Sequence, residues 1–342
     1  MDDAFRRVSR LRAVARIGSL GLATALLVSA GSLRAQGPPI LGPGDHTFRL
    51  EHRDLDRRYI VHVPSAVARD RSAVVVALHG GGGSASQFKE ENGLDAVSDR
   101  EGFLAVYPDG TGPLAGRLLT WNAGPHCCGW AANNEVDDVA FLAAVLDDLA
   151  RRTSVDGGRI YAIGHSNGSM MAYRLAAERP DLIMAIVAVA GAMDATLDRP
   201  VPPVAVLHIH SADDPRALYE GGIGPPFPLT DQRVEHQPVM RGLDAWAANN
   251  GCGPMPRVTG EREETAAQAR TRGRGSVPHT VTRLVWDGCV ENGAVEHLRL
   301  TGAGHGWPGS DVGWLRRRLV GDGTTLLDAS DEAWAFLVQF RR

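Results

Sequence analysis

Residues 159–179 of this 342-residue chain read RIYAIGHSNGSMMAYRLAAER. The first part, Arg159–Ile163, is an apolar, β-branched run that predicts a buried strand, and Gly168–Arg179 has the apolar spacing of a helix. Between them, GHSNG places a serine among glycines in a tight strand–turn–helix connection. Such a turn lifts Ser166 clear of the sheet and brings a helix N-terminus beside it, which favours nucleophilic chemistry at this serine.

Strands and helices alternate along the rest of the chain. This alternation predicts an α/β fold with a mostly parallel, doubly wound sheet, helices on both faces, and one domain over residues 36–342. The charged segment Glu261–Val277 is interpreted as a solvated excursion. The expected strands are Tyr59–Val63, Ala73–Leu78, Phe103–Tyr107, Arg159–Ile163, Ala185–Ala190, Val204–Ile209, Thr280–Trp286 and Val295–Leu300, and the expected helices are Ala85–Arg100, Val136–Arg152, Gly168–Arg179, Val234–Asn249 and Ser330–Phe340.

The N-terminal segment has a composition of its own. Arginines are concentrated in Met1–Arg16, an apolar run follows from Ile17 to Ala30, and small residues lie around Ala30 and Ala35. This layout predicts a secretory signal peptide over residues 1–35, because the apolar run is too short to span a bilayer comfortably. We therefore expect a secreted or periplasmic protein with no stable membrane association after signal cleavage.

The charge balance argues against several classes of partner. The chain has 36 basic and 40 acidic residues, a net charge of −4, and removal of residues 1–35 would leave 30 basic and 38 acidic residues, a net charge near −8. An acidic surface disfavours nucleic acid and anionic membranes. Lys89 is the single lysine in the sequence, so chemistry that needs a lysine nucleophile is not expected.

A serine needs a base to take its proton before it becomes a useful nucleophile. His305 is the best placed of the 12 histidines, in the glycine-rich loop GHGWP that follows the last expected parallel strand. His208 and His210 lie two residues apart on one strand, so both point to the same face and are expected to pack or cap locally. His165 adjoins the serine but is expected to be turned away from it.

A carboxylate should orient the imidazole of that base. Asp213 and Asp214 both follow the strand Val204–Ile209, and both are candidates. We favour Asp214, because Pro215 stops the turn from continuing and fixes the carboxylate position. The order serine, aspartate, histidine along the chain is also that of the α/β-hydrolase fold.

Two backbone N–H groups should stabilise negative charge on the substrate oxygen in an oxyanion hole. One is expected from Asn167, directly after the serine. The other is expected from Gly81 in HGGGG (79–83), where glycines let the backbone approach the substrate closely. A phosphate-binding loop is disfavoured, because no Lys-Ser/Thr pair follows these glycines.

The four cysteines predict one disulfide in an exported protein. We expect Cys252 to pair with Cys289, because these two flank a polar segment with little apolar content to anchor it. Cys127 and Cys128 would then be vicinally bonded or free. No C-x-x-C pair is present, so a structural zinc site is not expected.

Several stretches are shared with a known family: LHGGGGSA (78–85), YPDGT (107–111), WNAGPHCCG (121–129), VDDVAF (136–141), GHSNGSMMAYRLAAERPDL (164–182), HIHSADDP (208–215), NNGC (249–252) and GAGHGWPG (302–309). On these residues the chain resembles the secreted polyhydroxybutyrate depolymerase and feruloyl-esterase-like family of α/β-hydrolases. The resemblance implies that Ser166, Asp214 and His305 form a catalytic triad and that no cofactor is needed. The stretch before Asp214 departs from the usual family turn, which keeps Asp213 in contention.

Together these features predict a serine esterase that hydrolyses short polyester oligomers through an acyl-enzyme. A feruloyl or acetylxylan esterase acting on plant polysaccharide esters is the alternative, and a non-catalytic carbohydrate-binding module is the alternative of another class. The expected partner is a small or oligomeric ester. The acidic surface should disfavour carboxylate-rich substrates through repulsion. Loop residues near the triad that are candidates for substrate binding are Trp121, His126, Tyr219 and Trp307.

Overall fold

The computed structural model describes residues 41–65, 71–124, 127–192, 200–226, 232–273 and 276–342. These residues belong to one compact unit, Gly37–Arg342. The signal peptide predicted over residues 1–35 and the candidate His126 lie outside the described residues. Within the described ranges, no helix is both long enough and apolar enough to cross a membrane.

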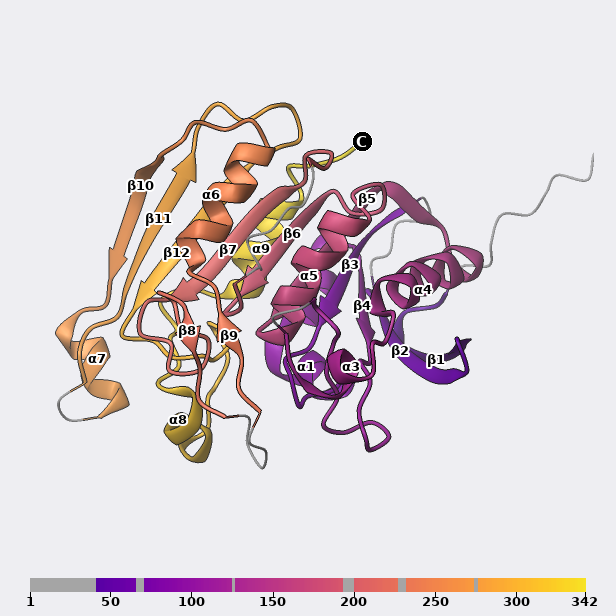
Figure 1. The fold of residues 1–342 in the computed structure, drawn as a ribbon, viewed down its shortest axis with the longest axis horizontal. Coiled ribbons are helices and arrows are strands. Elements are labelled where there is room, and N and C mark those ends of the chain that lie inside the picture. The colour runs from indigo at the N-terminus through magenta and orange to yellow at the C-terminus, as the bar shows by residue number, and fades with distance from the viewer. Residues whose placement is uncertain (1–40, 66–70, 125–126, 193–199, 227–231, 274–275) are drawn as a thin grey trace, which may run out of the picture. The chain divides into compact units, whose positions relative to one another are not determined.

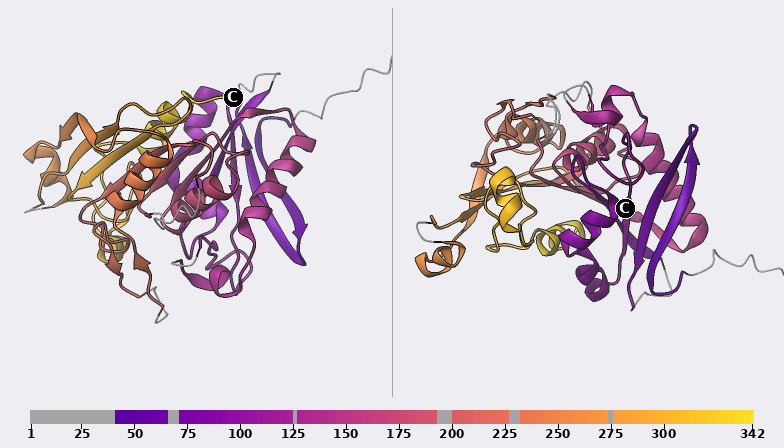
Figure 2. Two further views of the ribbon diagram at one scale, coloured as in Figure 1. Left: turned by 45° about the horizontal axis from the view of Figure 1, so that its top comes forward. Right: turned by 90° about the horizontal axis from the view of Figure 1, so that it is seen from below.

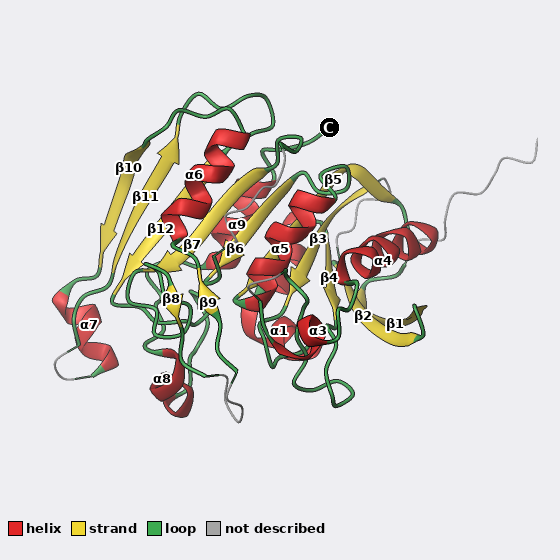
Figure 3. Ribbon diagram, in the orientation of Figure 1, coloured by secondary structure: helices red, strands yellow, loops and turns green. Residues whose placement is uncertain are grey.

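One ten-stranded sheet forms the centre of the described residues, and its six middle strands run parallel (Figures 1 and 3). The pairs at both ends of the sheet are antiparallel. A short pair, β8 (Gly222–Ile223) and β9 (Glu235–His236), is separate. From edge to edge the strands are β1 (Gly44–His52), β2 (Leu55–Val63), β4 (Leu104–Pro108), β3 (Ser72–Leu78), β5 (Val155–His165), β6 (Ala185–Val189), β7 (Ala205–Ser211), β12 (Val295–Thr301), β11 (Thr280–Trp286) and β10 (Pro256–Glu263).

Helices cover both faces of the sheet, and each face has its own apolar core. The core on one face includes residues of α4 (Asp138–Arg152), α5 (Asn167–Glu178) and α6 (Val239–Asn249), which lie in front of the sheet in Figure 1. The opposite core includes α1 (Ala85–Asn92), α2 (Leu94–Glu101) and α9 (Ala329–Leu337). Strands covered on both faces are apolar along their whole length, which is why they could be recognised as runs. The predicted α/β-hydrolase fold is confirmed.

The remaining helices are short: α3 (Gly129–Asn133), α7 (Ala266–Arg272) and α8 (Trp314–Val320). The right-hand view of Figure 2, seen from below, shows the indigo β1–β2 pair at one end of the sheet and the orange segment with β10 and α7 at the other.

Some predicted elements were wrong in their limits. The helix expected over Ala85–Arg100 is two helices, because Gly93 adopts a φ of 70° and ends the first one. The helix expected from Val234 begins only at Val239. Part of the expected excursion Glu261–Val277 is regular structure, since β10 pairs with β11 and α7 follows it.

The start of the last helix also differs from the prediction. Asp328 is its N-cap and accepts hydrogen bonds from the backbone N–H groups of Ser330 and Asp331. Ser330 itself is buried, and its hydroxyl donates to the carbonyl of Asn92. This bond therefore connects α9 to α1, which cover the same face of the sheet.

Candidate active site

The turn between β5 and α5 holds Ser166 in an unusual backbone conformation, with φ 54° and ψ −118°. Both flanking glycines are needed for steric reasons. A Cβ atom on Gly164 would lie 2.1 Å from the carbonyl oxygen of Gly168, and one on Gly168 would lie 2.2 Å from that of Leu78. The N–H of Ser166 donates to Val189 of β6 at 2.8 Å, which fixes the turn to the sheet. The strained conformation is thus imposed by its surroundings.

Three side chains from three strand ends meet at this turn. The Oγ of Ser166 lies 2.8 Å from His305 Nε2, and His305 Nδ1 lies 2.7 Å from Asp214 Oδ2. Because a carboxylate oxygen only accepts, Nδ1 carries the ring hydrogen and leaves Nε2 free to take a proton from the serine. Burial alone would raise the pKa of Asp214, but the charge of His305 and hydrogen bonding by His210 and His305 hold it well below its usual range. The carboxylate therefore stays ionised.

The two adjacent aspartates point to different places. The other oxygen of Asp214, Oδ1, accepts from the N–H groups of Arg216 at 2.7 Å and Ala217 at 2.9 Å, so both oxygens are held. Asp213 is exposed, and its carboxylate accepts from the N–H of Gly302 at 2.7 Å. Asp214 is therefore the carboxylate that faces His305.

The loop that carries His305 is fixed by backbone contacts. The N–H of Gly304 donates to Asp322, and a Cβ on Gly304 would lie 2.0 Å from the carbonyl oxygen of Val320. His165 also contacts this loop, since its Nε2 lies 2.7 Å from the carbonyl oxygen of His305. The ring of His165 thus contacts the loop of the base, and no hydrogen bond between described residues joins it to Ser166. Its burial lowers the pKa of His165 to about 3, so the ring donates as a neutral imidazole.

The glycine loop after β3 is held by its own histidine. The Nδ1 of His79 lies 2.8 Å from the Gly80 carbonyl oxygen, and its Nε2 accepts from the N–H of Gly110 at 2.9 Å. The N–H groups of Gly82 and Gly83 donate to Leu119 and Gly80. Gly81 lines the cavity in front of Ser166. The loop is fixed before substrate arrives, as a donor to an oxyanion must be.

Trp121 links this loop to the residue after the serine. Its backbone N–H donates to Asn167 Oδ1 at 2.7 Å, and Asn167 Nδ2 donates back to its carbonyl at 2.9 Å. Its indole N–H donates to the His79 carbonyl at 3.0 Å. Trp121 thus ties together the two segments from which the oxyanion donors are expected.

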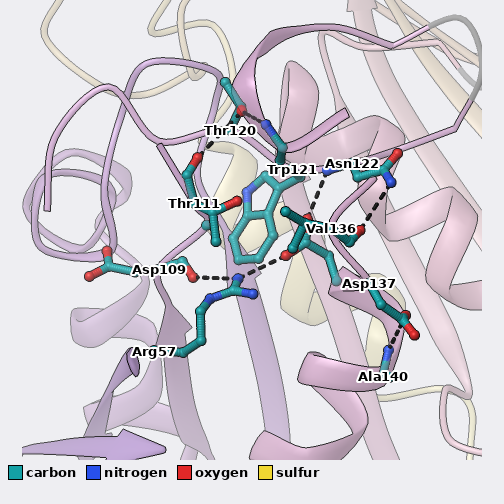
Figure 4. A network of polar contacts seen from close by, with 12 residues as sticks. Arg57, Asp109, Thr111, Thr120, Trp121, Asn122, Val136, Asp137 and Ala140 are labelled. Atoms are coloured by element: carbon teal, nitrogen blue, oxygen red, sulfur yellow. Dashed lines mark hydrogen bonds and ion pairs between the residues drawn. The ribbon is translucent and has the colours of Figure 1, made fainter. Parts of the chain in front are cut away.

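A buried ion pair supports Trp121 from below (Figure 4). The guanidinium of Arg57 lies 2.8 Å from Asp138 and donates to the carbonyl of Asp109 at 3.0 Å. The second oxygen of Asp138 accepts from the N–H of Asn122 at 2.8 Å. The segment around Trp121 is therefore anchored to β2 and α4.

A cavity of about 600 Å³ opens in front of the serine. Both Ser166 and His305 line it, together with the backbone of the glycine loop. Two arginines also line it, and one of them, Arg316, is paired with Glu91 at 2.5 Å. Apolar lining residues include Phe88, Leu118, Met170, Trp307, Val312 and Leu319.

The described residues contain one cluster with the side-chain types of a metal site, formed by Asp45, His62 and Asp95. The ammonium group of Lys89 bridges its two carboxylates, at 2.7 Å and 2.5 Å. This cluster is therefore already balanced by a cation of the chain itself.

Comparison with known proteins identifies the family. Residues 57–226 match the family model described as "Esterase PHB depolymerase". The chain is 30% identical over 298 residues to "Putative esterase NocK" of Nocardia uniformis subsp. tsuyamanensis, covering 82% of this chain and 79% of that protein. The chain belongs to the PHB depolymerase family of esterases.

Two further similarities are more distant. Feruloyl esterase B of Piromyces equi is 28% identical over 215 residues, which are 59% of this chain and 37% of that protein. Among solved structures, an acetyl xylan esterase from Aspergillus awamori superposes with a TM-score of 0.47 at 15% identity, over 76% of this chain and 94% of that one.

The candidate substrate residues of this PHB-depolymerase-family esterase differ in their placement. Trp307 lines the cavity, as proposed from the sequence. Trp121 and Tyr219 are buried and do not line it, so neither is retained as a substrate contact. Arg216 lines the cavity, and sequence reasoning missed it. Its position two residues after Asp214 was the available signal.

The cysteines of this esterase form one disulfide, between Cys252 and Cys289. Cys127 and Cys128 are free thiols, and their sulfur atoms lie 3.2 Å apart. Asn167 Nδ2 donates to the sulfur of Cys127 at 2.8 Å. The thiol pair thus contacts the side chain that also holds Trp121.

Proposed function

We propose that this esterase is a secreted serine hydrolase that cleaves carboxylic esters through an acyl-enzyme on Ser166. The observation that carries the proposal is the continuous chain from Ser166 Oγ through His305 to Asp214, at 2.8 Å and 2.7 Å, beside an open cavity. A nucleophile, a base and an orienting carboxylate in contact are what acyl transfer by serine requires.

The reaction follows from the roles of these atoms. Ser166 Oγ attacks the ester carbonyl carbon while its proton moves to His305 Nε2. The N–H groups of Asn167 and Gly81 donate to the oxygen that becomes negative, and the N-terminus of α5 adds its dipole. His305 then gives the proton to the departing alcohol, and the acyl group stays on Ser166. A water molecule, deprotonated by His305, releases the acid and restores the serine.

Short oligomers of hydroxy acids are the substrate class that we propose. Apolar side chains on the cavity wall, among them Phe88, Met170 and Trp307, suit the short aliphatic units of such a chain. Arg216 also lines the cavity, and no described carboxylate lies within 4.0 Å of its guanidinium. The terminal carboxylate of a substrate can pair with this guanidinium. The repulsion of carboxylates that is expected from the acidic surface therefore does not apply inside the cavity.

Feruloyl and acetyl esters of polysaccharides remain the second candidate. The support for it is the naming of relatives as feruloyl esterases and as a bifunctional acetylxylan esterase/xylanase. These substrates carry no charge near the ester bond that is cleaved, so they would supply no carboxylate to pair with Arg216.

Export is proposed from two features. The N-terminal pattern of arginines, an apolar run and small residues is typical of a signal peptide over residues 1–35. The disulfide between Cys252 and Cys289 suits an oxidising compartment outside the cytoplasm.

One panel tests the substrate proposal: a hydroxybutyrate trimer with a free carboxylate, its methyl ester, methyl ferulate and acetylated xylan. We expect the free trimer to have the highest kcat/KM. Arg216→Gln should lower kcat/KM for the free trimer roughly tenfold and leave the methyl ester unchanged. A preference for methyl ferulate or acetylated xylan in the wild-type protein would replace the oligomer proposal with the second candidate.

A further inference from the structure

A row of buried aromatic side chains leads to the back of Asp214. His208 and His210 point to the same face of β7 because they are two residues apart on the strand. Both rings are buried, with 1% of each residue exposed. The hydroxyl of Tyr173 on α5 lies 3.0 Å from His208 Nδ1, and His208 Nε2 lies 3.0 Å from His210 Nδ1.

The end of the row reaches the triad. His210 Nε2 lies 2.9 Å from the carbonyl oxygen of Ala217 and 3.3 Å from Asp214 Oδ2. The latter is the same oxygen that faces His305 Nδ1. Asp214 Oδ2 therefore lies between two imidazole rings, one on the reacting side and one behind it.

The direction of every hydrogen bond in the row follows from its last member. The two oxygens near His210 Nε2 are the carbonyl oxygen of Ala217 and Asp214 Oδ2. Both can only accept a hydrogen bond, so this nitrogen carries the hydrogen of the ring. In a neutral ring the opposite nitrogen, Nδ1, must then accept, so its partner His208 Nε2 donates. By the same reasoning His208 Nδ1 accepts from the hydroxyl of Tyr173. All donors point the same way, towards Asp214.

We propose that Tyr173, His208 and His210 form a neutral hydrogen-bond relay that positions Asp214, with His210 as the positioning residue for the triad. The proposal rests on the serine-hydrolase function proposed above and adds a residue to it. The relay touches no substrate and acts only through the carboxylate.

The donor directions given above hold for neutral rings. A proton added to His208 Nδ1 would displace the hydroxyl of Tyr173 as donor. Burial also lowers the pKa of His208 well below its usual value. The other titratable groups near the row are Tyr219, His236, His297 and His305.

A neutral donor behind the carboxylate has a specific use. A charged ring at His210 would compete with His305 for the negative charge of Asp214 during the reaction. A neutral ring holds Oδ2 in place and leaves that charge for the imidazolium that forms on the other side. Donors in series also polarise one another, which strengthens the last bond of the row.

The direct test compares two substitutions at one position. His210→Phe keeps most of the ring volume but removes the donor, whereas His210→Gln keeps an N–H donor and an acceptor. We expect His210→Phe to lower kcat roughly 10- to 100-fold, the value of one hydrogen bond to a charged group, with KM unchanged. His210→Gln should restore kcat to within about threefold of wild type. Equal kcat in His210→Gln and His210→Phe would overturn the proposal, as would a wild-type kcat in His210→Phe.

Milder variants keep the test decisive if His210→Phe does not fold. Tyr173→Phe removes the hydroxyl at the start of the relay. Tyr219→Phe is its matched control, because this hydroxyl of a buried tyrosine lies 2.9 Å from His297 Nε2 and is not in series with Asp214. We expect Tyr173→Phe to lower kcat about two- to fivefold and Tyr219→Phe to leave kcat unchanged. Equal kcat in the two variants contradicts the relay. Loss of esterase activity in Ser166→Ala, by contrast, bears only on the proposed function.

Discussion

The middle of the sheet and its β10 edge are stabilised in different ways. Every residue of β6 and β7 is buried, with an apolar core on both faces. β10 has no buried residue, and it is held by backbone pairing with β11, by the Cys252–Cys289 disulfide and by exposed ion pairs such as Arg257–Asp287 at 2.9 Å. Packing dominates in the first region, whereas covalent and main-chain bonds dominate in the second.

This difference explains where the chemistry lies. A buried side chain between two packed layers has few alternative positions, so distances such as the 2.7 Å between His305 and Asp214 are held closely. An exposed edge strand leaves its side chains free to move in solvent. The proposed triad lies at strand ends of the middle region, so substitutions there should affect activity far more than substitutions at the edge.

The largest expected contrast between two adjacent residues separates the aspartates of the middle region. Asp214→Asn should lower kcat about 10⁴-fold, because the amide cannot both hold the His305 tautomer and balance its charge. Asp213→Asn, on the exposed side of the same turn, should change kcat less than about threefold. Steady-state kinetics on p-nitrophenyl acetate give both values. A greater loss in Asp213→Asn would move the assignment by one residue.

Acid should destabilise the middle region through its buried histidines. Burial lowers the pKa of His79 to about 4 and that of His165 and His297 to about 3. In the unfolded chain these rings take up protons below about pH 6.5, whereas in the folded protein they stay neutral until far lower pH. Stability therefore falls as the pH drops, and each ring should remove about 2 kcal/mol between pH 7 and pH 5. Urea unfolding at the two pH values measures the change, and equal stabilities would contradict it.

Two arginines give a matched comparison of the two regions. Arg57→Gln breaks a buried pair, with side-chain exposures of 2% and 0%, and should cost about 3–5 kcal/mol of unfolding free energy. It should also lower kcat, since Asp138 then holds the Trp121 segment less firmly. Arg257→Gln breaks an exposed pair at the β10 edge, so it should lower the unfolding free energy only slightly and leave kcat unchanged. Similar effects of the two substitutions would show that the edge is as tightly coupled to the site as the middle.

The smallest expected effect on activity comes from the disulfide. Replacing Cys252 and Cys289 together by serine opens a loop with a sequence separation of 37 and should cost about 3–4 kcal/mol in the chain-entropy model. The bond lies at the edge, so kcat of the folded variant should equal that of wild type. A large loss of kcat in protein that remains folded would mean that the edge supports the site. Peptide mapping that joins Cys252 to Cys127 or Cys128 would contradict the pairing itself.

The middle region is also where the sequence was most informative. GHSNG could be recognised because the turn excludes every side chain at Gly164 and Gly168. The apolar strands β5, β6 and β7 could be recognised because both of their faces are buried. In contrast, β10 carries charged residues without alternation, so nothing in its composition separates it from a solvated loop.

Side-chain direction was the part that the sequence could not supply. Trp121 and Tyr219 were placed in loops near the triad correctly, but both turn inward and bind other parts of the chain. His165 contacts the carbonyl oxygen of His305, 140 residues later in the chain. Orientation in such loops depends on long-range contacts that no local pattern contains.

Covalent labelling tests the central claim, that Ser166 is the nucleophile of this esterase, most directly. A fluorophosphonate reacts with a serine only when a base activates it and an oxyanion hole binds the phosphoryl oxygen. We predict one label per folded chain, located by peptide mass spectrometry at Ser166, with esterase activity lost in proportion to labelling. Ser166→Ala should take up no label and lose about 10⁵- to 10⁶-fold in kcat. A label on another residue, or unlabelled protein that still hydrolyses esters, would contradict the account, and protein with neither label nor activity would point to the non-catalytic carbohydrate-binding alternative.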